Sequence, residues 1–270
     1  MRSSGISLEV SDLSLTLEGR AILRGIAFSA DAGDFICVVG RNGAGKSTLF
    51  KCIAGIYRNF SGAVGVGGRR LPSLGERDRA RMIAYVPQSA PSNIPYTVRE
   101  FMEMSRYSWR GVSSLADDAR AVSEAFEMTD TGFLADRRMD SLSGGERQKV
   151  MIASAIAQET GIILMDEPTS YLDYAHQAET AEVMARVNVE RGVTMLTVTH
   201  DVNMAVRLSR RIIAFSGGSV IWSGPPDEIL DESLLRSIYG VSFEWYYSGA
   251  QCGGYPLLAP AQSKGVLLRV

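Results

Sequence analysis

The stretch from residue 35 to residue 53, FICVVGRNGAGKSTLFKCI, limits what this chain can fold into more than any other feature. Its opening FICVVG is a continuous apolar run, which is typical of a strand that is buried on both faces of a parallel sheet. Its end places Leu49, Phe50 and Ile53 at helical spacing. The sequence therefore predicts an α/β fold in which a glycine-rich loop joins a buried strand to a helix.

The loop, residues 40–48 and called the P-loop below, has the spacing G-x-x-x-x-G-K-[ST]. In such a loop the backbone N–H groups curl around phosphates, the lysine reaches the β- and γ-phosphates, and the serine hydroxyl is offered to Mg²⁺. The context of strand and helix argues against a chance glycine-rich turn. The motif therefore predicts binding of a nucleotide such as ATP, and it leaves hydrolysis open. The expected contacts are Gly40, Asn42, Gly43, Ala44, Gly45, Lys46, Ser47 and Thr48.

Composition sets outer limits on the function. The chain has 270 residues, of which 46% are hydrophobic, and a formal net charge of −2. This is enough to bury a large core, and the mildly acidic balance gives no electrostatic case for a nucleic-acid partner. No apolar stretch approaches the roughly 18–20 residues that span a bilayer, and the opening MRSSGISLEV lacks the apolar region of a secretory signal. We expect a cytoplasmic chain.

The hydrophobic pattern divides the chain into regions. Alternating apolar and polar residues before the P-loop predict an antiparallel sheet, whereas residues 89–160 carry helical periodicity and predict a helical subdomain inserted into the core. Strand candidates return at 161–166 and 193–200, with a helix between them, and a hairpin follows at 211–224. We expect one domain over residues 6–240. A C-terminal extension, residues 241–270, has the pattern of a small β element.

The segment IILMDEPTSYLD, residues 162–173, bears on hydrolysis. Its apolar start predicts a strand that delivers Asp166 at the carboxyl end, where α/β sheets place ligands. Asp166 would hold Mg²⁺, and the adjacent Glu167 could orient and deprotonate an attacking water. The alternative, that both carboxylates only cap the next helix, is disfavoured beside a P-loop.

A second candidate phosphate-binding segment, besides the P-loop, is LSGGE, residues 142–146. Ser143 and Glu146 have the spacing of a capping box, and Gly144 and Gly145 allow close approach of a ligand to the backbone. Taken alone, the segment fits an ordinary capped helix equally well. A helix N-terminus with glycines can also bind phosphate, and one triphosphate seldom needs two cradles from one subunit. The economical interpretation is a head-to-tail dimer, in which this segment contacts the ATP of another copy.

Five segments in this order and spacing resemble the nucleotide-binding subunit of an ABC transporter: GRNGAGKST, YVPQ, LSGGERQK, IILMDEPTSYLD and VTHD. The resemblance implies a P-loop NTPase core of the ABC ATPase type, with an N-terminal antiparallel β subdomain and an inserted helical subdomain. It implies that Gln88 contacts Mg²⁺ or water and relays to a permease. It also implies that His200 contacts the γ-phosphate and that Asp173 communicates across the dimer.

One position departs from the family pattern. The family usually stacks an aromatic residue on adenine, just before a turn of the G-x-R type, and here Leu17 takes that place in LTLEGRAIL. An aliphatic side chain can cover the base, but aromatic stacking is lost. We therefore expect Leu17 to contact adenine with altered selectivity and affinity.

Three segments that are less specific than the five motifs indicate a branch of the family. RDRARMIAYVPQ, YTVREFMEMSRY and IYGVSFEW are similar to importers of iron–siderophore, haem and vitamin B12 chelates. The resemblance implies ATP and Mg²⁺ as cofactors, and as partners a second copy, transmembrane permease subunits and, indirectly, a solute-binding protein. It implies no nucleic acid, and a peripheral position on the cytoplasmic face of the inner (plasma) membrane.

Several features of the sequence disfavour functions other than transport. Chromosome and repair ATPases insert a long coiled coil between the P-loop and the LSGGE segment, and translation-factor relatives carry two cassettes, whereas this chain has one cassette with a compact insertion. A nucleotide-responsive binding module would not need both Glu167 and His200, and a kinase would leave LSGGERQK unexplained. The main alternative is a non-transport ABC-type ATPase that acts on nucleic acid or the ribosome.

Overall fold

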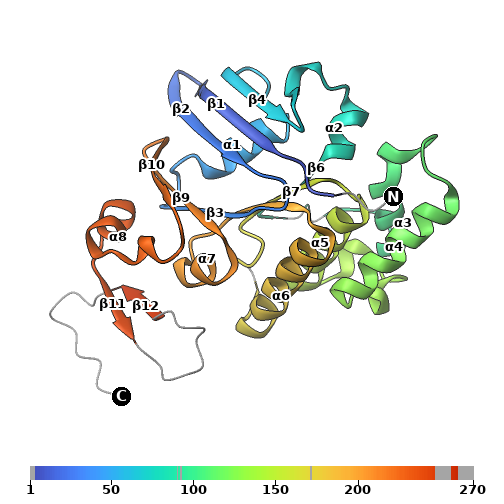
Figure 1. Cartoon of the computed structure of the whole chain (residues 1–270). Helices are drawn as coiled ribbons and strands as arrows, with labels where there is room; N and C mark the ends of the chain where they lie inside the picture. Colours follow the sequence, from blue (N-terminus) through green and yellow to red (C-terminus); the bar gives the residue numbers. More distant parts are fainter. Residues whose placement is uncertain (1–3, 90, 92, 171, 247–256, 261–270) are drawn as a thin grey trace.

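The structure, a computed structural model, describes residues 4–89, 91, 93–170, 172–246 and 257–260. Most of the expected C-terminal extension lies outside this part of the chain. Among the residues described, no helix is both long and apolar enough to cross a membrane. Figure 1 shows the two larger sheets with helices below and beside them, and the small sheet of β11 (Phe243–Tyr246) and β12 (Leu257–Pro260) apart from them near the C-terminus.

The central sheet has six strands in the order β10-β9-β3-β8-β7-β6. All neighbouring pairs are parallel except β9 with β10, which form the expected hairpin. Every residue of β3, β7 and β8 is buried, as the continuous apolar runs predict. The strands are β3 (Phe35–Gly40), β6 (Ile83–Val86), β7 (Ile162–Asp166), β8 (Thr194–Val198), β9 (Arg211–Ser216) and β10 (Ser219–Gly224).

The predicted antiparallel sheet packs on one face of the central sheet. Its order is β2-β1-β4-β5, and a core that also includes α1 lies between the two sheets. Alternation along β3 places Ile36 and Val38 in this core, while Phe35 and Val39 face the helices on the other side. The elements are β1 (Leu8–Leu17), β2 (Arg20–Ala30), α1 (Lys46–Ile53), β4 (Ser61–Val66) and β5 (Arg69–Arg70).

Most of the described chain between β6 and β7 is helical, and Figure 1 shows α3 and α4 at the end of the molecule away from α8 (Glu232–Tyr239). Thr97, Ser114 and Ser143 each form a capping box, which explains where the α-helices of this region begin. The elements are α3 (Val98–Met104), η2 (Ser105–Trp109), α4 (Leu115–Thr129), η3 (Gly132–Leu134), η4 (Met139–Ser141) and α5 (Gly144–Ala157).

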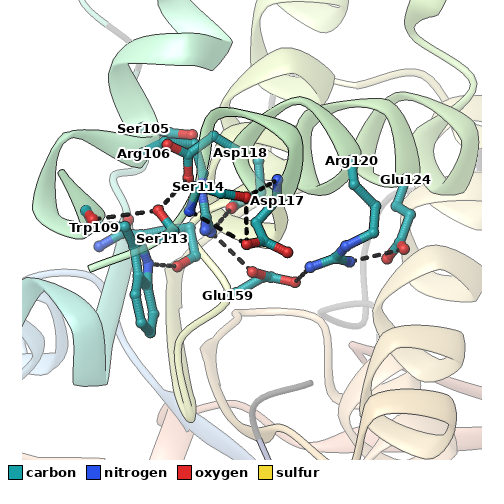
Figure 2. A network of polar contacts seen from close by, with 12 residues as sticks. Ser105, Arg106, Trp109, Ser113, Ser114, Asp117, Asp118, Arg120, Glu124 and Glu159 are labelled. Carbon is teal, nitrogen blue, oxygen red and sulfur yellow. Dashed lines mark hydrogen bonds and ion pairs between the residues drawn. The ribbon is translucent and has the colours of Figure 1, made fainter. Parts of the chain in front are cut away.

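A buried ion network joins this helical region to the end of α5 (Figure 2). Arg106, from η2, bonds Asp118 of α4 at 2.8 Å, Glu159 at 3.0 Å and the carbonyl of Ala157 at 2.7 Å. Glu159 also meets Arg120 at 3.1 Å. Because Glu159 lies just before β7, the network connects the inserted helices to the strand that carries Asp166.

Of the remaining helices, α6, α7, η5 and α8 contribute to the core on the second face of the central sheet, whereas α2 lies beside β6 and η1 beside β4. α6 confirms the helix expected between β7 and β8, whereas α2, α7 and α8 were not predicted from the sequence. These and the other remaining elements are η1 (Leu71–Ser73), α2 (Glu76–Met82), α6 (Tyr174–Arg191), α7 (Val202–Leu208), η5 (Glu228–Leu230), α8 (Glu232–Tyr239), β11 (Phe243–Tyr246) and β12 (Leu257–Pro260).

Candidate active site

The P-loop wraps around the ammonium group of Lys46. Its Nζ donates to the carbonyl of Gly40 at 2.7 Å and to that of Arg41 at 2.9 Å, and the side chain is only 4% exposed. Gly40 (φ +145°) leaves no space for a side chain, because a Cβ there would lie 2.3 Å from the carbonyl oxygen of Phe215. Burial lowers the pKa of Lys46, and the nearby Glu167 and Asp166 oppose this shift. The loop therefore holds a cation close to two carboxylates.

Asp166 ends β7 with its carboxylate buried beside the P-loop. Ser47 Oγ donates to Oδ1 at 2.9 Å, and the Tyr85 hydroxyl donates to Oδ2 at 3.2 Å. Burial raises the pKa of Asp166, although these two donors lower it. A hydroxyl and a carboxylate in contact are hard oxygen donors of the kind that Mg²⁺ takes from a protein when phosphates and water complete its shell. The pair fits this ion, and no group of three or more His, Cys, Asp or Glu within the described residues forms a fuller cage.

Replacing Asp166 by asparagine is expected to raise the thermal midpoint of the nucleotide-free chain by a few degrees near neutral pH. The raised pKa means that the ionised carboxylate costs folding free energy above that pKa, and this cost disappears as the pH falls toward the ordinary aspartate value. Differential scanning calorimetry without nucleotide, at neutral and at acidic pH, tests both statements. ATPase activity should fall in the same variant.

Asp117→Asn is the matched control, because hydrogen bonds from Ser114 lower the pKa of Asp117. Its midpoint should fall at neutral pH and approach that of the unmodified chain at acidic pH. A lower midpoint for Asp166→Asn at neutral pH would contradict the stated cost of burying this carboxylate.

Glu167 is the centre of a second group of side chains. Its Oε2 accepts from Gln88 Nε2 at 3.0 Å and from Ser170 Oγ at 2.6 Å, and His200 Nδ1 lies 3.4 Å away. The backbone of Glu167 is left-handed, with φ +48°, and its N–H donates to the carbonyl of Val198 at 3.0 Å. A non-glycine residue held this way costs roughly 1–3 kcal/mol, and such residues cluster at functional sites. The structure thus brings together Gln88, Glu167 and His200.

Leu17 lies at the end of β1, opposite Arg20. It is half-buried and packs against the core between the two sheets, which also contains Ala44 of the P-loop. The first residues of β2 touch the same loop, because a Cβ at Gly45 would lie 3.0 Å from the carbonyl oxygen of Ile22. Leu17 is therefore on the side of the P-loop formed by the antiparallel sheet, and its contact with adenine stays a prediction.

The LSGGE segment lies at the N-terminus of α5. Ser143 Oγ accepts from the backbone N–H of Glu146 at 3.2 Å, and the Glu146 carboxylate accepts from the N–H of Ser143 at 2.8 Å. A Cβ at Gly145 would lie 3.2 Å from Leu172, next to Asp173. The segment shares a pocket of about 470 Å³ with the start of α6, where the lining residues include Ser143, Gly145, Glu146, Leu172, Asp173 and His176.

The side chains grouped around Glu167 open on a different pocket of about 570 Å³. Its lining includes Gly40, Arg41, Asn42, Glu167 and His200, and within the described residues it shares none with the pocket at the LSGGE segment. One subunit therefore presents two separate pockets, one beside the P-loop and Glu167 and one beside the capped N-terminus of α5. Gly144, in the first turn of α5, lies beside the second pocket.

Sequence reasoning missed three side chains of this site. Tyr85 stands in the quoted segment YVPQ and Ser170 follows Glu167 by three residues, but neither spacing indicates a hydrogen bond to a carboxylate. His176 belongs to none of the quoted motifs, and its Nδ1 lies 2.9 Å from Asp173 Oδ1 at the edge of the LSGGE pocket. The contact of Tyr85 with Asp166 could be predicted only if β6 and β7 were known to be neighbouring strands.

Comparison with known proteins agrees with the resemblance to ABC transporter subunits. The profile of the family described as ABC transporter matches residues 23–170. The iron(3+)-hydroxamate import ATP-binding protein FhuC of Bacillus subtilis is 36% identical, with 88% of this chain and 89% of that protein covered. The hemin import ATP-binding protein HmuV of Rhodococcus jostii is also 36% identical, with 88% and 81% covered.

Two solved structures extend the likeness to three dimensions. A metal-chelate type ABC transporter in an inward-facing conformation is similar with a TM-score of 0.80 at 26% identity, over 96% of this chain and 98% of that one. A dimeric ATP-binding cassette bound to ADP and Pi gives a TM-score of 0.73 at 27% identity, over 81% and 98%. The chain belongs to the ABC transporter family, with the ABC-type P-loop fold. Within this family it is the ATP-binding subunit, an ATPase.

Proposed function

We propose that this chain powers the import of a metal chelate of the iron–siderophore, haem or cobalamin type. It does so as a peripheral subunit on the cytoplasmic face of the inner (plasma) membrane, bound to permease subunits that receive cargo from a solute-binding protein. The observation that carries the proposal is the 36% identity to FhuC over 88% of the chain, because FhuC is named for iron(3+)-hydroxamate import. The solved transporter of the metal-chelate type, with its TM-score of 0.80, supports the same class of cargo.

ATP is bound between two copies of the chain. The P-loop half-site of one copy holds the triphosphate, and the LSGGE half-site of the other, with Ser143, Gly144, Gly145 and Glu146, closes over it. The separation of the two pockets supports this arrangement, since a single subunit does not join them. The dimeric cassettes among the solved structures support it independently. Asp173, at the rim of the LSGGE pocket, then carries information between the two copies.

Hydrolysis uses the groups that converge at the ends of β3, β7 and β8. Glu167 Oε2 accepts a proton from the attacking water, while Gln88 and Ser170 hold that carboxylate in place. Lys46 and the P-loop N–H groups offset the charge that develops on the phosphate, and His200 donates to the γ-phosphate. Ser47, Asp166 and Gln88 hold Mg²⁺, which neutralises phosphate charge when bound. Leu17 covers the adenine.

The test is purification of the tagged chain from gently solubilised native membranes, followed by identification of the proteins that accompany it. We expect a multi-span permease and a solute-binding protein, and chelate uptake should stop when the chain carries Lys46→Ala. That variant is the matched control, because it should still bring down the permease. Recovery from the soluble fraction alone, with ribosomal or DNA-associated proteins, would contradict transport and leave the ATPase assignment in place.

A further inference from the structure

The described part of the C-terminal extension packs onto the ATPase domain. β11 and β12 pair in antiparallel register, with Trp245 opposite Leu258. Leu258 is buried, and Phe243 and Trp245 pack against the core beneath α7 and α8. The ring of Tyr239, at the end of α8, meets that of Phe243 edge-on with centroids 5.5 Å apart. This strand pair, called the C-terminal hairpin below, is therefore an integral layer beside the site.

Asn203 attaches the hairpin to the helix that follows His200. Its Nδ2 donates to the carbonyl of Leu258 at 3.1 Å, and its Oδ1 accepts from the N–H of the same residue at 2.8 Å. One amide side chain thus satisfies both backbone groups of a strand residue, as a neighbouring strand would. Asn203 is the second residue of α7, so the clasp acts on the first turn of that helix.

The hairpin also forms a wall of the pocket on which the reacting groups open. Phe243, Leu258 and Pro260 line the pocket of about 570 Å³ that contains Glu167 and His200. Arg41 of the P-loop lies close to the same segment, because a Cβ at Gly240, the residue directly after α8, would lie 3.3 Å from its Nη1. A guanidinium at a helix C-terminus is favourably placed against the helix dipole. Hydrogen bonds therefore tie α7 to the hairpin, and Arg41 of the P-loop lies beside the end of α8.

His200 depends on its backbone for orientation. Its side chain is 59% exposed, so packing constrains the ring weakly. On one side the backbone is fixed to the sheet, because Thr199 N–H donates to the carbonyl of Val38 at 3.1 Å. On the other side it enters α7, whose N-cap is Asp201 and whose first turn is held by Asn203.

We propose that Asn203 is a positioning residue for His200, and that the C-terminal hairpin is the anchor through which it acts. The inference rests on the proposed contact between His200 and the γ-phosphate. With the clasp in place, the first turn of α7 is fixed and the imidazole stays beside Glu167. Without the clasp, that turn shifts and the imidazole leaves the position in which it serves the reacting phosphate.

The test compares ATP hydrolysis by the full chain and three variants. Asn203→Leu removes both hydrogen bonds at nearly constant volume and is expected to lower kcat about tenfold with little change in KM for ATP. Asn203→Asp keeps the acceptor for Leu258 N–H and should give an intermediate kcat, which preserves the test if the leucine variant does not fold. Asn59→Leu is the control, because it makes the same chemical change at an exposed residue between α1 and β4 and should keep the original kcat.

A double-mutant cycle with His200→Ala shows whether the effect passes through His200. In that background Asn203→Leu is expected to change the residual rate by less than about twofold, because the group that it positions is gone. Full kcat in Asn203→Leu, or an equal loss in both backgrounds, would overturn the role of Asn203 while leaving that of His200 in place. An original rate in His200→Ala alone would instead overturn the proposed role of His200.

Discussion

Glu167→Gln is expected to lower ATP turnover by roughly two to four orders of magnitude, the range typical for removal of a general base, while leaving ATP binding intact. The amide cannot accept the proton of the attacking water, yet it has the same shape and can still accept one hydrogen bond from Gln88 or Ser170. Phosphate release measures turnover, and titration calorimetry with ATP measures binding.

The matched control is Glu190→Gln, on the exposed part of α6, which should retain the original rate. It makes the same chemical change at a distance from the site. If Glu167→Gln kept its full ATPase activity, the water-activating group would have to be another residue, and the assignment of Glu167 would be wrong.

Arg106→Leu is expected to lower the free energy of unfolding by about 3–5 kcal/mol, since removing one partner leaves buried charges uncompensated. The side chains of Arg106 and Glu159 are 4% and 7% exposed, so water can solvate little of the Glu159 carboxylate once its ion pair with Arg106 is removed. The carbonyl of Ala157 also loses its donor, and the contact of the guanidinium with the Trp109 ring, 5.2 Å from its centroid, disappears (Figure 2). Urea unfolding followed by circular dichroism measures the change.

Arg99→Leu provides the comparison within the same helical region. Arg99 pairs with Asp136 at 3.0 Å, but both side chains are exposed, and such surface pairs contribute about 0–1 kcal/mol. Equal losses in the two variants would show that burial of the Arg106 network adds nothing to stability.

The parts of the fold predicted from the sequence are those that a local pattern determines. The apolar run of β3, the P-loop and the helical spacing of α1 lie in one continuous stretch, and β7 and β8 have the same fully buried character. The sequence did not predict β6, because this strand has only four residues and begins directly after α2. Its pairing with β7 has no signal in its own sequence. α7 was missed for a similar reason: it is seven residues long and begins directly after the segment that contains His200.

The candidate site likewise contains some contacts that the sequence predicts and others that only the tertiary structure shows. Ser47, Asp166 and Glu167 could be expected near one another, because parallel strands bring their carboxyl ends to one edge of the sheet. The family resemblance implies that Gln88 contacts Mg²⁺ or water and that His200 contacts the γ-phosphate, and both contacts stay predictions. The structure places Gln88 Nε2 3.0 Å and His200 Nδ1 3.4 Å from Glu167 Oε2, which the sequence analysis did not predict. The clasp of Asn203 on Leu258 joins residues 55 positions apart across a tertiary contact, and no sequence spacing encodes it.

The most direct test of the shared ATP site is the mass in solution of the Glu167→Gln chain with and without ATP. Light scattering should give 29.3 kDa without nucleotide and twice that value with ATP and Mg²⁺. Adding Ser143→Arg, which places a bulky side chain at the LSGGE half-site, should keep the chain at the lower mass. A chain that binds ATP with full occupancy and stays at 29.3 kDa would contradict a site completed by the second copy.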